Sequence, residues 1–448
     1  MSFHSVRKQS VGFMWEEVMS EDSLQRRRDI ALGAGAELFY DKPLEIVRGE
    51  GVYLFDSDGR RYVDMYNNVP VVGHANEAVV RAMANQQATL NTHSRYLHEG
   101  IVAFAERLTG LYHDGIESAV FGCSGTEAVE IALQIARLTT GSRGIICTDS
   151  TYHGNTELVA SMSYLGEDPP CTGEIRAFPF PELYRPLKAG LREEALCDVY
   201  LDRVADSIDS LKSEGQGFAA LIMCSIFANE GPPDVPDGFM QKVTDLAHRE
   251  GGLVISDEVQ AGYGRTGHWW GYEATGFIPD IAVTGKPMGN GLPISAAATS
   301  KDLVDAFRAE KDYFNTTAAS PLQAAVGMAV LDEIERLNLV ATAAEVGNWL
   351  TRELKNRAAG SDVIGDTRGY GLFLGVEMVR DSHSKKPNAR LTLEISDRLK
   401  NKGFLTSYSG KYNNVLKIRP PLVFSRENAE SFLDAFDECM AELGDSIS

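Results

Sequence analysis

Cysteine is scarce in this sequence, and no two cysteines form a C-x-x-C pair. The six thiols are scattered, so a disulfide framework is not expected and they are predicted to stay reduced. The nine histidines include no HExxH or comparable ligand spacing, so no protein-bound metal is predicted. The cysteines are Cys123, Cys147, Cys171, Cys197, Cys224 and Cys439.

Positive charge and long apolar runs are also lacking. Lys and Arg number 43 against 63 Asp and Glu, a formal net charge of −20. Nucleic-acid binding depends on clustered Lys and Arg, so a nucleic-acid partner is not expected. Met1–Trp15 contains no apolar signal core, and no run reaches the roughly 20 apolar residues that a membrane helix needs. The sequence therefore predicts a soluble, cytoplasmic protein without a membrane partner.

What the sequence does have is enough apolar material for a large interior. Its 448 residues exceed one average domain, and 44% hydrophobic with 24% charged residues is typical of a globular protein. Strand-like apolar runs alternate with amphipathic helical stretches, which predicts a mostly parallel sheet with helices on both faces. The expected strands lie at 119–121, 144–147, 219–224, 253–256 and 281–284, and the expected helices at 126–138, 155–162 and 239–248.

The two ends of the chain follow other patterns. Residues 52–65 form two β-rich runs around an Asp-Gly turn, which predicts a hairpin, and a helix is expected at 77–90. From Asn338 a long helix precedes Gly-rich strands, then helix, strand and helix. The Pro- and Gly-rich stretch 166–189 is expected to pass over the surface. We predict an N-terminal segment (1–67) that belongs to a small domain, a large domain (68–337) and a C-terminal α+β domain (338–448).

Ligands of open α/β sheets bind at the carboxyl ends of strands, so the residues that follow the apolar runs are candidates. Gly122 to Glu127 reads as a turn and a helix start, where free N–H groups, the helix dipole and hydroxyls favour a phosphate. Ser124 and Glu127 also have the spacing of a capping box, which satisfies a helix end without any ligand. Taken alone, this motif favours the cap.

Asp257 and Glu258 end a run that should be buried. A buried carboxylate is costly without a cation, so Asp257 should face a protonated pyridine nitrogen or a metal, unless it only caps the next turn. The glycines on both sides of Arg265 indicate a loop that lies close to another group.

Two cationic residues also follow apolar runs. Lys286 lies between glycines and before Pro287, where partial desolvation would lower its pKa and free the amine as a nucleophile or base. Simple exposure is the usual fate of a loop lysine. Arg419 precedes two prolines, where it could bind a carboxylate or phosphate or close an internal salt bridge.

The order of these motifs, from about Leu44 to Phe432, resembles the class III (ornithine-type) aminotransferase family of fold type I enzymes that use pyridoxal 5'-phosphate (PLP). The resemblance implies a fold type I PLP-dependent transferase, with a large α/β/α domain that has a mostly parallel sheet plus a smaller α+β domain. It implies that Lys286 holds the cofactor and that the protein is a homodimer with its active site at the subunit interface.

The resemblance also assigns contacts around the cofactor. Lys286, Asp257 and Tyr152 are the predicted catalytic residues, with Tyr152 stacked on the ring and Asp257 paired with the ring nitrogen. The remaining predicted contacts are Ser124, Gly125 and Thr126 at the phosphate, Val259 and Gln260 against the ring and its phenolic oxygen, and Thr316 of the neighbouring subunit at the phosphate. Two segments depart from the family pattern: Thr317 to Pro321 lacks the usual two glycines, and Cys224 to Gly231 lacks a Glu-Pro pair.

Within the family, residues 66–69, 90–98, 285–291 and 414–421 resemble the ethanolamine-phosphate and hydroxylysine phospholyases. By that resemblance the enzyme eliminates phosphate and ammonia from ethanolamine phosphate, giving acetaldehyde, or acts on a similar phosphorylated amine. A phosphate leaving group needs local positive charge. Arg95 and Arg419 are the candidates, with Asn67 and Asn68 as neutral donors, and a structural ion pair is the competing role for Arg95.

Two other functions fit the same residues. An aminotransferase of the alanine–glyoxylate or ω-amino-acid type would use Arg419 to bind a substrate carboxylate. A non-catalytic scaffold or PLP-binding regulator is the third candidate. The complete set of Lys286, Asp257, Gly125 and Thr126 argues against that third candidate.

Overall fold

The structure, a computed structural model, describes residues 23–163 and 173–447. The predictions for Met1–Trp15, Cys171 and residues 166–172 lie outside the described residues. The chain divides into two units, residues 1–45 and 46–448. In the first unit, helix α2 (Leu24–Leu32) follows Ser23, whose hydroxyl oxygen accepts a hydrogen bond from the backbone N–H of Arg26 at 3.3 Å. All other described helices and strands belong to the second unit.

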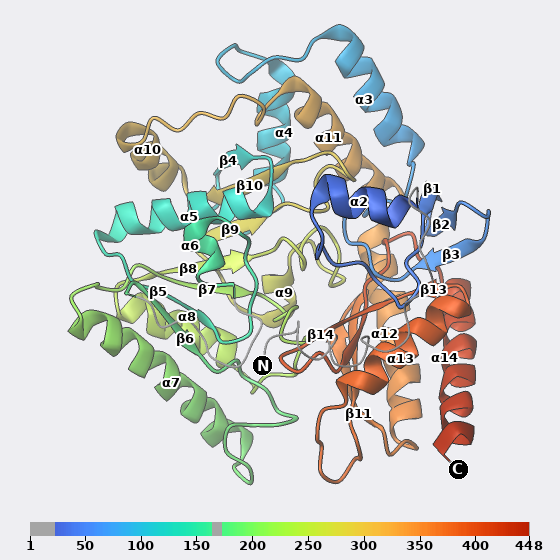
Figure 1. The fold of residues 1–448 in the computed structure, drawn as a ribbon. Helices are drawn as coiled ribbons and strands as arrows, with labels where there is room; N and C mark the ends of the chain where they lie inside the picture. The colour runs from blue at the N-terminus through green and yellow to red at the C-terminus, as the bar shows by residue number, and fades with distance from the viewer. Residues whose placement is uncertain (1–22, 164–172, 448) are drawn as a thin grey trace. The chain divides into compact units, whose positions relative to one another are not determined.

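The main sheet of the second unit has seven strands in the order β4-β10-β9-β8-β7-β5-β6 (Figure 1). Only β10 runs against its neighbours, and it is antiparallel to both β4 and β9. The mostly parallel α/β sheet that the sequence predicts is therefore confirmed. The strands are β4 (Ser118–Gly122), β5 (Ile145–Thr148), β6 (Ile175–Phe178), β7 (Ala220–Cys224), β8 (Leu253–Asp257), β9 (Ile281–Thr284) and β10 (Ser295–Thr299).

Helices pack on both faces of this sheet because successive strand side chains point to opposite sides. Val120 and Ile145 share a buried cluster with α5 (Gly125–Thr140) and α10 (Lys301–Glu310). Their neighbours Phe121 and Ile146 belong to the other cluster, with α4 (Glu99–Thr109), α7 (Glu193–Ser213) and α8 (Phe239–Arg249). The remaining helices of this part are α3 (Glu77–Thr89), α6 (Glu157–Ala160), α9 (Gly271–Thr275) and α11 (Pro321–Arg336).

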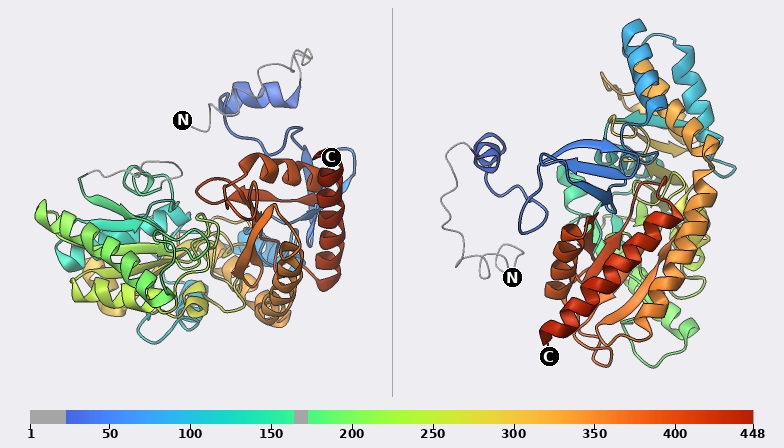
Figure 2. Two further views of the ribbon diagram at one scale, coloured as in Figure 1. Left: turned by 90° about the horizontal axis from the view of Figure 1, so that it is seen from below. Right: turned by 90° about the vertical axis from the view of Figure 1, so that its right-hand side faces the viewer.

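The C-terminal part of the chain forms an antiparallel sheet of order β11-β12-β15-β14 with three helices (Figure 2). Helix α13 contacts both this sheet and α14, as the two views show. None of the helices in the described ranges is long and apolar enough to span a membrane. The elements are α12 (Leu339–Ala358), β11 (Ile364–Tyr370), β12 (Phe373–Met378), α13 (Ala389–Asn401), β14 (Ser407–Ser409), β15 (Val415–Ile418) and α14 (Arg426–Ile447).

A third sheet joins early and late parts of the chain. Strands β1 (Ile46–Glu50), β2 (Tyr53–Asp56) and β3 (Arg61–Asp64) are antiparallel, which confirms the hairpin predicted at 52–65. Strand β13 (Phe404–Leu405) then pairs in parallel with β3. This pairing supports assigning the hairpin to the small domain, and the three-part domain division stays a prediction.

Two expectations for the main sheet are wrong. The stretch 166–189 does not simply pass over the surface, because β6 lies within it and pairs in parallel with β5, Ile145 opposite Ile175. The surrounding prolines and glycines hide this four-residue strand in the sequence. The helix expected at 155–162 is reduced to the single turn of α6.

Candidate active site

A cavity of about 320 Å³ lies at the carboxyl ends of the central strands, where the sheet topology directs ligands. Residues from the starts of α5 and of the loops after β5, β8 and β9 line it. These include eight of the nine predicted cofactor contacts, namely Ser124, Gly125, Thr126, Tyr152, Asp257, Val259, Gln260 and Lys286. One chain therefore brings together all of the predicted contacts except Thr316.

The N-terminus of α5 forms one wall of this cavity. Ser124 caps the helix by accepting a hydrogen bond from Glu127 N–H at 3.2 Å, but the Glu127 carboxylate accepts from Cys123 N–H at 2.7 Å instead of completing the capping box. A Cβ at Gly125 would lie 3.0 Å from the Val259 methyl groups, so the close approach of these two segments requires glycine. The helix terminus thus presents backbone N–H groups and two hydroxyls to the cavity, a combination that suits a phosphate.

Asp257, the last residue of β8, is held on two sides. Its Oδ2 lies 2.7 Å from Nδ1 of His153, and its Oδ1 accepts a hydrogen bond from Val259 N–H at 3.0 Å. Nε2 of His153 lies 3.0 Å from the Thr151 hydroxyl. His153 lies between Tyr152 and Gly154 in the sequence. The family resemblance assigns a role to Tyr152 but none to His153. The contact fixes the direction in which the Asp257 carboxylate points.

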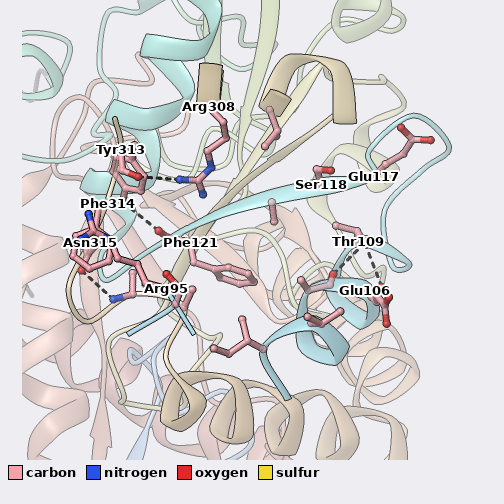
Figure 3. Close-up of a pocket in the computed structure, with 18 of the residues that line it drawn as sticks. Arg95, Glu106, Thr109, Glu117, Ser118, Phe121, Arg308, Tyr313, Phe314 and Asn315 are labelled. Atoms are coloured by element: carbon pink, nitrogen blue, oxygen red, sulfur yellow. Dashed lines mark hydrogen bonds between the residues drawn. The ribbon is translucent and has the colours of Figure 1, made fainter. Parts of the chain in front are cut away.

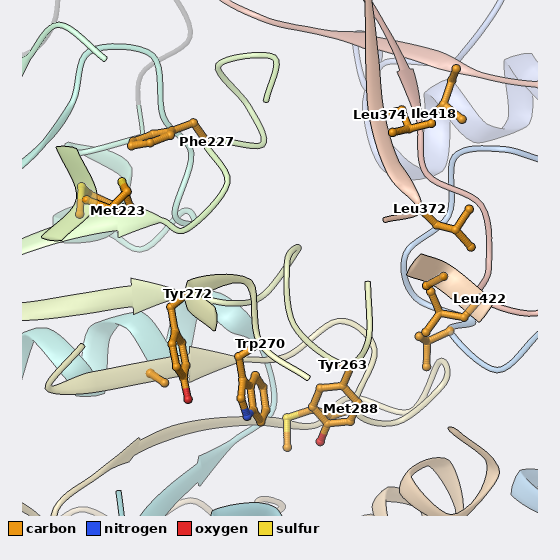
Figure 4. Close-up of a cluster of buried hydrophobic side chains, with 14 of the residues drawn as sticks. Met223, Phe227, Tyr263, Trp270, Tyr272, Met288, Leu372, Leu374, Ile418 and Leu422 are labelled. Atoms are coloured by element: carbon orange, nitrogen blue, oxygen red, sulfur yellow. The ribbon is translucent and has the colours of Figure 1, made fainter. Parts of the chain in front are cut away.

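Glu258 points away to a structural role. Its carboxylate accepts hydrogen bonds from the N–H groups of Gly271 and Tyr272 at 2.6 and 3.1 Å and from the Ser256 hydroxyl at 2.7 Å. Burial raises the pKa of Glu258. The adjacent Trp270 stacks on Tyr112 with ring centroids 4.0 Å apart, and Figure 4 shows it beside Tyr263 and Tyr272 in the buried cluster. The two carboxylates at the end of β8 therefore serve different purposes, one in the cavity and one in the loop that follows.

Lys286 reaches the cavity from the end of β9. The side chain is exposed to the open space of the cavity, yet protein surrounds it closely on the other sides. Burial lowers the pKa of Lys286, the positive charge of Arg419 lowers it further, and Asp257 opposes both. A Cβ at Gly285 would lie 3.3 Å from the backbone of Gly125, so the lysine is held close to the start of α5. The desolvation expected from the sequence is present.

Arg419 lies behind the cavity wall. Its Nε donates to the Tyr66 carbonyl at 3.0 Å, and another guanidinium nitrogen donates to Oε1 of Gln260, which lines the cavity. Burial lowers the pKa of Arg419. Within residues 23–163 and 173–447 no carboxylate pairs with Arg419, so the internal salt bridge considered as its alternative role is not formed there.

Asn67 and Asn68 lie outside the cavity lining. Asn68 is buried, and its amide donates to the carbonyls of Val259 and Gln260 at 3.3 and 3.2 Å while its Oδ1 accepts from Arg265 at 3.0 Å. Both amide hydrogens are donated within the chain, so Asn68 supports the loop of Val259, and its role as a donor to the substrate stays a prediction. The backbone N–H of Asn67 donates to Asp64 at 2.9 Å, and its side chain is half-buried.

Arg95 lies at a different cavity of about 560 Å³, between α4, β4 and the segment that contains Phe314 (Figure 3). Its guanidinium stands 4.0 Å over the Phe314 ring, and no acid of the described residues forms an ion pair with it. Asn315 donates to the Glu127 carboxylate at 2.5 Å, which ties this segment to α5. Thr316 lines neither cavity. Arg95 and Thr316 therefore join Asn67 and Asn68 among the predicted residues that do not line the Lys286 cavity in one chain.

Comparisons with known proteins agree with this geometry. The family model for aminotransferase class-III matches residues 39–440. A solved phospholyase from Arthrobacter, in complex with phosphoethanolamine, is 39% identical with a TM-score of 0.90, covering 94% of this chain and 99% of that one. An "alanine--glyoxylate aminotransferase 2-like" protein of Drosophila melanogaster is 36% identical, covering 95% and 88% of the two chains. "Ethanolamine-phosphate phospho-lyase homolog 1" of Caenorhabditis elegans is 31% identical, covering 95% and 94%.

Proposed function

Because the chain belongs to the class-III aminotransferase family, we propose that it is a PLP-dependent phospholyase that acts on ethanolamine phosphate or a similar phosphorylated amine. The net reaction on ethanolamine phosphate takes up one water and yields acetaldehyde, ammonia and inorganic phosphate. The similarity to the Arthrobacter phospholyase supports this choice, at 39% identity against 36% for the fly aminotransferase-like protein.

The observation that carries the proposal is the buried cation of Arg419 directly behind Gln260. A guanidinium in the interior is costly when no carboxylate compensates its charge. An anionic group of the substrate would supply that compensation, and the hydrogen bond to Gln260 connects the guanidinium to the cavity that contains Lys286. The phosphate of an amine phosphate is an anion that Arg binds through several hydrogen bonds.

Family membership implies PLP, and the groups around the cavity fit it. The start of α5, with Ser124 and Thr126, would hold the cofactor phosphate, and Asp257 would pair with the ring nitrogen. The Tyr152 ring, 38% exposed, is available for stacking, with Val259 and Gln260 on the loop after β8. When bound, PLP supplies an electron sink for negative charge that develops on the substrate carbon next to nitrogen.

Lys286 would both hold the cofactor and move the proton. Its lowered pKa favours the neutral amine, which can accept the proton from the amine-bearing carbon of the substrate. The electrons of that C–H bond allow the phosphate to leave from the neighbouring carbon with the electron pair of its C–O bond. Arg419 would offset the charge of the departing phosphate, and His153 would keep Asp257 in place.

We further propose that the active enzyme is a homodimer. Arg95 and Asn315 line the second cavity, Thr316 follows Asn315 in the chain, and the contact of Asn315 with Glu127 joins this segment to the start of α5. A second copy would then bring its Thr316 to the cofactor phosphate and its Arg95 toward the substrate. The cytoplasmic location remains a prediction from the sequence.

The second candidate is an aminotransferase, which the fly relative favours. Arg419 would then bind a substrate carboxylate, because a guanidinium suits a carboxylate as well as a phosphate. The two candidates differ in whether a keto acid is needed as amino acceptor.

The deciding experiment is incubation of the PLP-loaded enzyme with ethanolamine phosphate in the absence of any keto acid, with inorganic phosphate and acetaldehyde measured in parallel. Equal amounts of both, together with a change of the visible cofactor band, are expected. No phosphate release, together with activity on alanine plus glyoxylate, would replace the phospholyase by the aminotransferase. If the visible absorbance band of the cofactor stays unchanged when amines are added, the non-catalytic scaffold is favoured.

A further inference from the structure

Asn229 lies on the loop after β7, and its side chain binds two segments that line the Lys286 cavity. Its Nδ2 donates a hydrogen bond to the Tyr152 carbonyl at 3.3 Å, and its Oδ1 accepts one from Nε2 of Gln260 at 3.2 Å. Tyr152 and Gln260 line the cavity, whereas Asn229 does not. One half-buried amide therefore connects the loop after β5 with the loop after β8.

The groups at the two ends of this contact allow only one orientation of both amides. The Tyr152 carbonyl can only accept, so Asn229 faces it with its NH₂ group and turns its oxygen toward Gln260. The Arg419 guanidinium can only donate, so Gln260 turns its oxygen toward Arg419 and its NH₂ group toward Asn229. The hydrogen bonds thus run in one direction, from Arg419 to the Tyr152 carbonyl. Neither amide can flip without bringing two donors or two acceptors face to face.

This orientation leaves Gln260 with a second amide hydrogen at the cavity. A primary amide carries two hydrogens, and Asn229 accepts one of them. Among the described residues no other group accepts a hydrogen bond from Nε2 of Gln260. The Gln260 side chain is buried, at 8% exposure, and a buried N–H without an acceptor is costly. An acceptor atom of a ligand in the cavity would remove that cost.

The C-terminal sheet fixes the main chain of Asn229. The backbone N–H of Gly410, in the turn between β14 and β15, donates to the Asn229 carbonyl at 2.8 Å. A Cβ at Gly231 would lie 2.9 Å from a methyl group of Val415, so the close approach of the loop to β15 requires glycine there. Phe227 has a φ of 50°, a strained conformation that persists only where surrounding contacts hold the chain. The Asn229 amide therefore reaches the cavity from a fixed base.

We propose that Asn229 is a positioning residue that turns the NH₂ group of Gln260 toward the cofactor, where Gln260 donates a hydrogen bond to the phenolic oxygen. The proposal rests on the proposed use of PLP. It holds for phosphate elimination and for transamination alike, because both use the same cofactor. A hydrogen-bond donor stabilises the negative charge of a phenolic oxygen, so the loss of that donor makes the oxygen hold a proton more tightly.

The test compares Asn229→Ala with Asn428→Ala in the PLP-loaded enzyme. Asn428 is also half-buried, and its amide also donates on one side and accepts on the other, to the Tyr53 hydroxyl at 3.2 Å and from the Ser425 N–H at 3.1 Å. Asn428 lies outside the cavity lining, so its substitution is a matched control for the loss of such an amide. The melting temperature and the visible cofactor band establish that each variant is folded and loaded.

The first measurement is a pH titration of the visible cofactor band. In Asn229→Ala the midpoint should rise by about 0.4 to 1 pH unit, the effect of one lost hydrogen bond on a proton equilibrium. Asn428→Ala should keep the wild-type midpoint. A wild-type midpoint in a folded Asn229→Ala enzyme overturns the proposal, as does an equal rise in Asn428→Ala.

The second measurement asks whether Asn229 acts through Gln260. Asn229→Ala alone should lower kcat by about 2- to 10-fold. Gln260→Met removes the amide that Asn229 orients, so adding Asn229→Ala to it should lower kcat by less than about twofold more. The full loss in that background overturns the proposal, even if the wild-type enzyme turns over ethanolamine phosphate. A wild-type protein that forms no visible band with PLP overturns the proposed function and this inference together.

Discussion

The Asp257 carboxylate lies 2.7 Å from Nδ1 of His153, and both side chains are buried. This contact links the end of β8 to the motif that contains Tyr152. Replacing His153 by Phe keeps the buried ring volume and removes the hydrogen bond, so kcat should fall by roughly 10- to 100-fold. Asp257→Asn should fold normally and lower the rate by orders of magnitude, because a neutral partner supports the charged pyridine poorly. Steady-state kinetics of both variants check this, and a near-normal rate for Asp257→Asn would refute the assigned role.

Lys286 is expected to be indispensable for cofactor attachment. Lys286→Ala should lose both the visible band of the lysine-bound cofactor and all turnover, because no other amine lines the cavity that the structure describes. Absorbance and phosphate release measure the two effects. Lys301→Ala, at an exposed ion pair with Asp305, is the control and should retain both. A retained band in Lys286→Ala would mean that a different lysine holds the cofactor.

Glu230 should make the folded protein less stable as pH rises. Burial raises the pKa of Glu230 from 4.5 to about 7. Between these values the folded protein keeps a proton that the unfolded chain has released, so the stabilisation present below pH 4.5 declines and is lost by about pH 7. Glu230→Gln stays neutral and should remove this part of the decline. Denaturant midpoints from pH 4.5 to 8 measure it, and Glu50→Gln, on the surface, should leave the wild-type slope. An unchanged slope in Glu230→Gln would contradict the burial effect.

Trp270 should contribute strongly to stability. It is fully buried, stacks on Tyr112 and donates from Nε1 to the Leu111 carbonyl at 2.7 Å. Trp270→Ala leaves a cavity and an unpaired carbonyl, and should cost about 3–5 kcal/mol in free energy of unfolding. Ile278→Ala, at a 59% exposed side chain, should cost far less. Chemical unfolding of the loaded enzyme compares them, and similar losses in both would contradict the packing argument.

The proposed dimer predicts complementation between two impaired variants. If Arg95 acts in the neighbouring subunit's site, a mixed dimer of Lys286→Ala and Arg95→Ala contains one site with both residues intact. Co-refolded mixtures should then regain activity that the Arg95→Ala homodimer lacks, and light scattering should report twice the chain mass of 49.0 kDa. A monomer, or a mixture no more active than its components, would rule out a shared site.

Much of the site could be predicted because its residues follow buried strands. Asp257 ends β8 and Lys286 follows β9 after Gly285, so apolar runs in the sequence already mark where the carboxyl ends of the sheet lie. The start of α5 is marked in the same way, but its residues alone favour a complete capping box, and the phosphate role of Ser124 follows only from the family resemblance. The Glu127 carboxylate instead binds Cys123 and Asn315, and the latter contact joins residues 188 positions apart.

What the sequence could not reveal depends on tertiary neighbours. Strand β10 consists of small residues, Ser295 to Thr299, without the β-branched or aromatic pattern that marks a strand, and it forms because β4 and β9 flank it. The hydrogen bonds of the Asn68 amide reach the carbonyls of Val259 and Gln260, 191 and 192 positions away in the sequence. His153 directly follows Tyr152 in the sequence, but only the folded chain reveals its contact with Asp257.

The parallel pairing of β3 with β13 also governs when the fold can be completed during synthesis. Val63 N–H donates to the Gly403 carbonyl at 2.8 Å and Met65 N–H to the Leu405 carbonyl at 2.9 Å. The ribosome makes the hairpin early and its closing strand only near the end. A nascent chain therefore leaves the edge of β3 open until translation is almost finished, and a chain terminated before Phe404 keeps that edge open to other proteins.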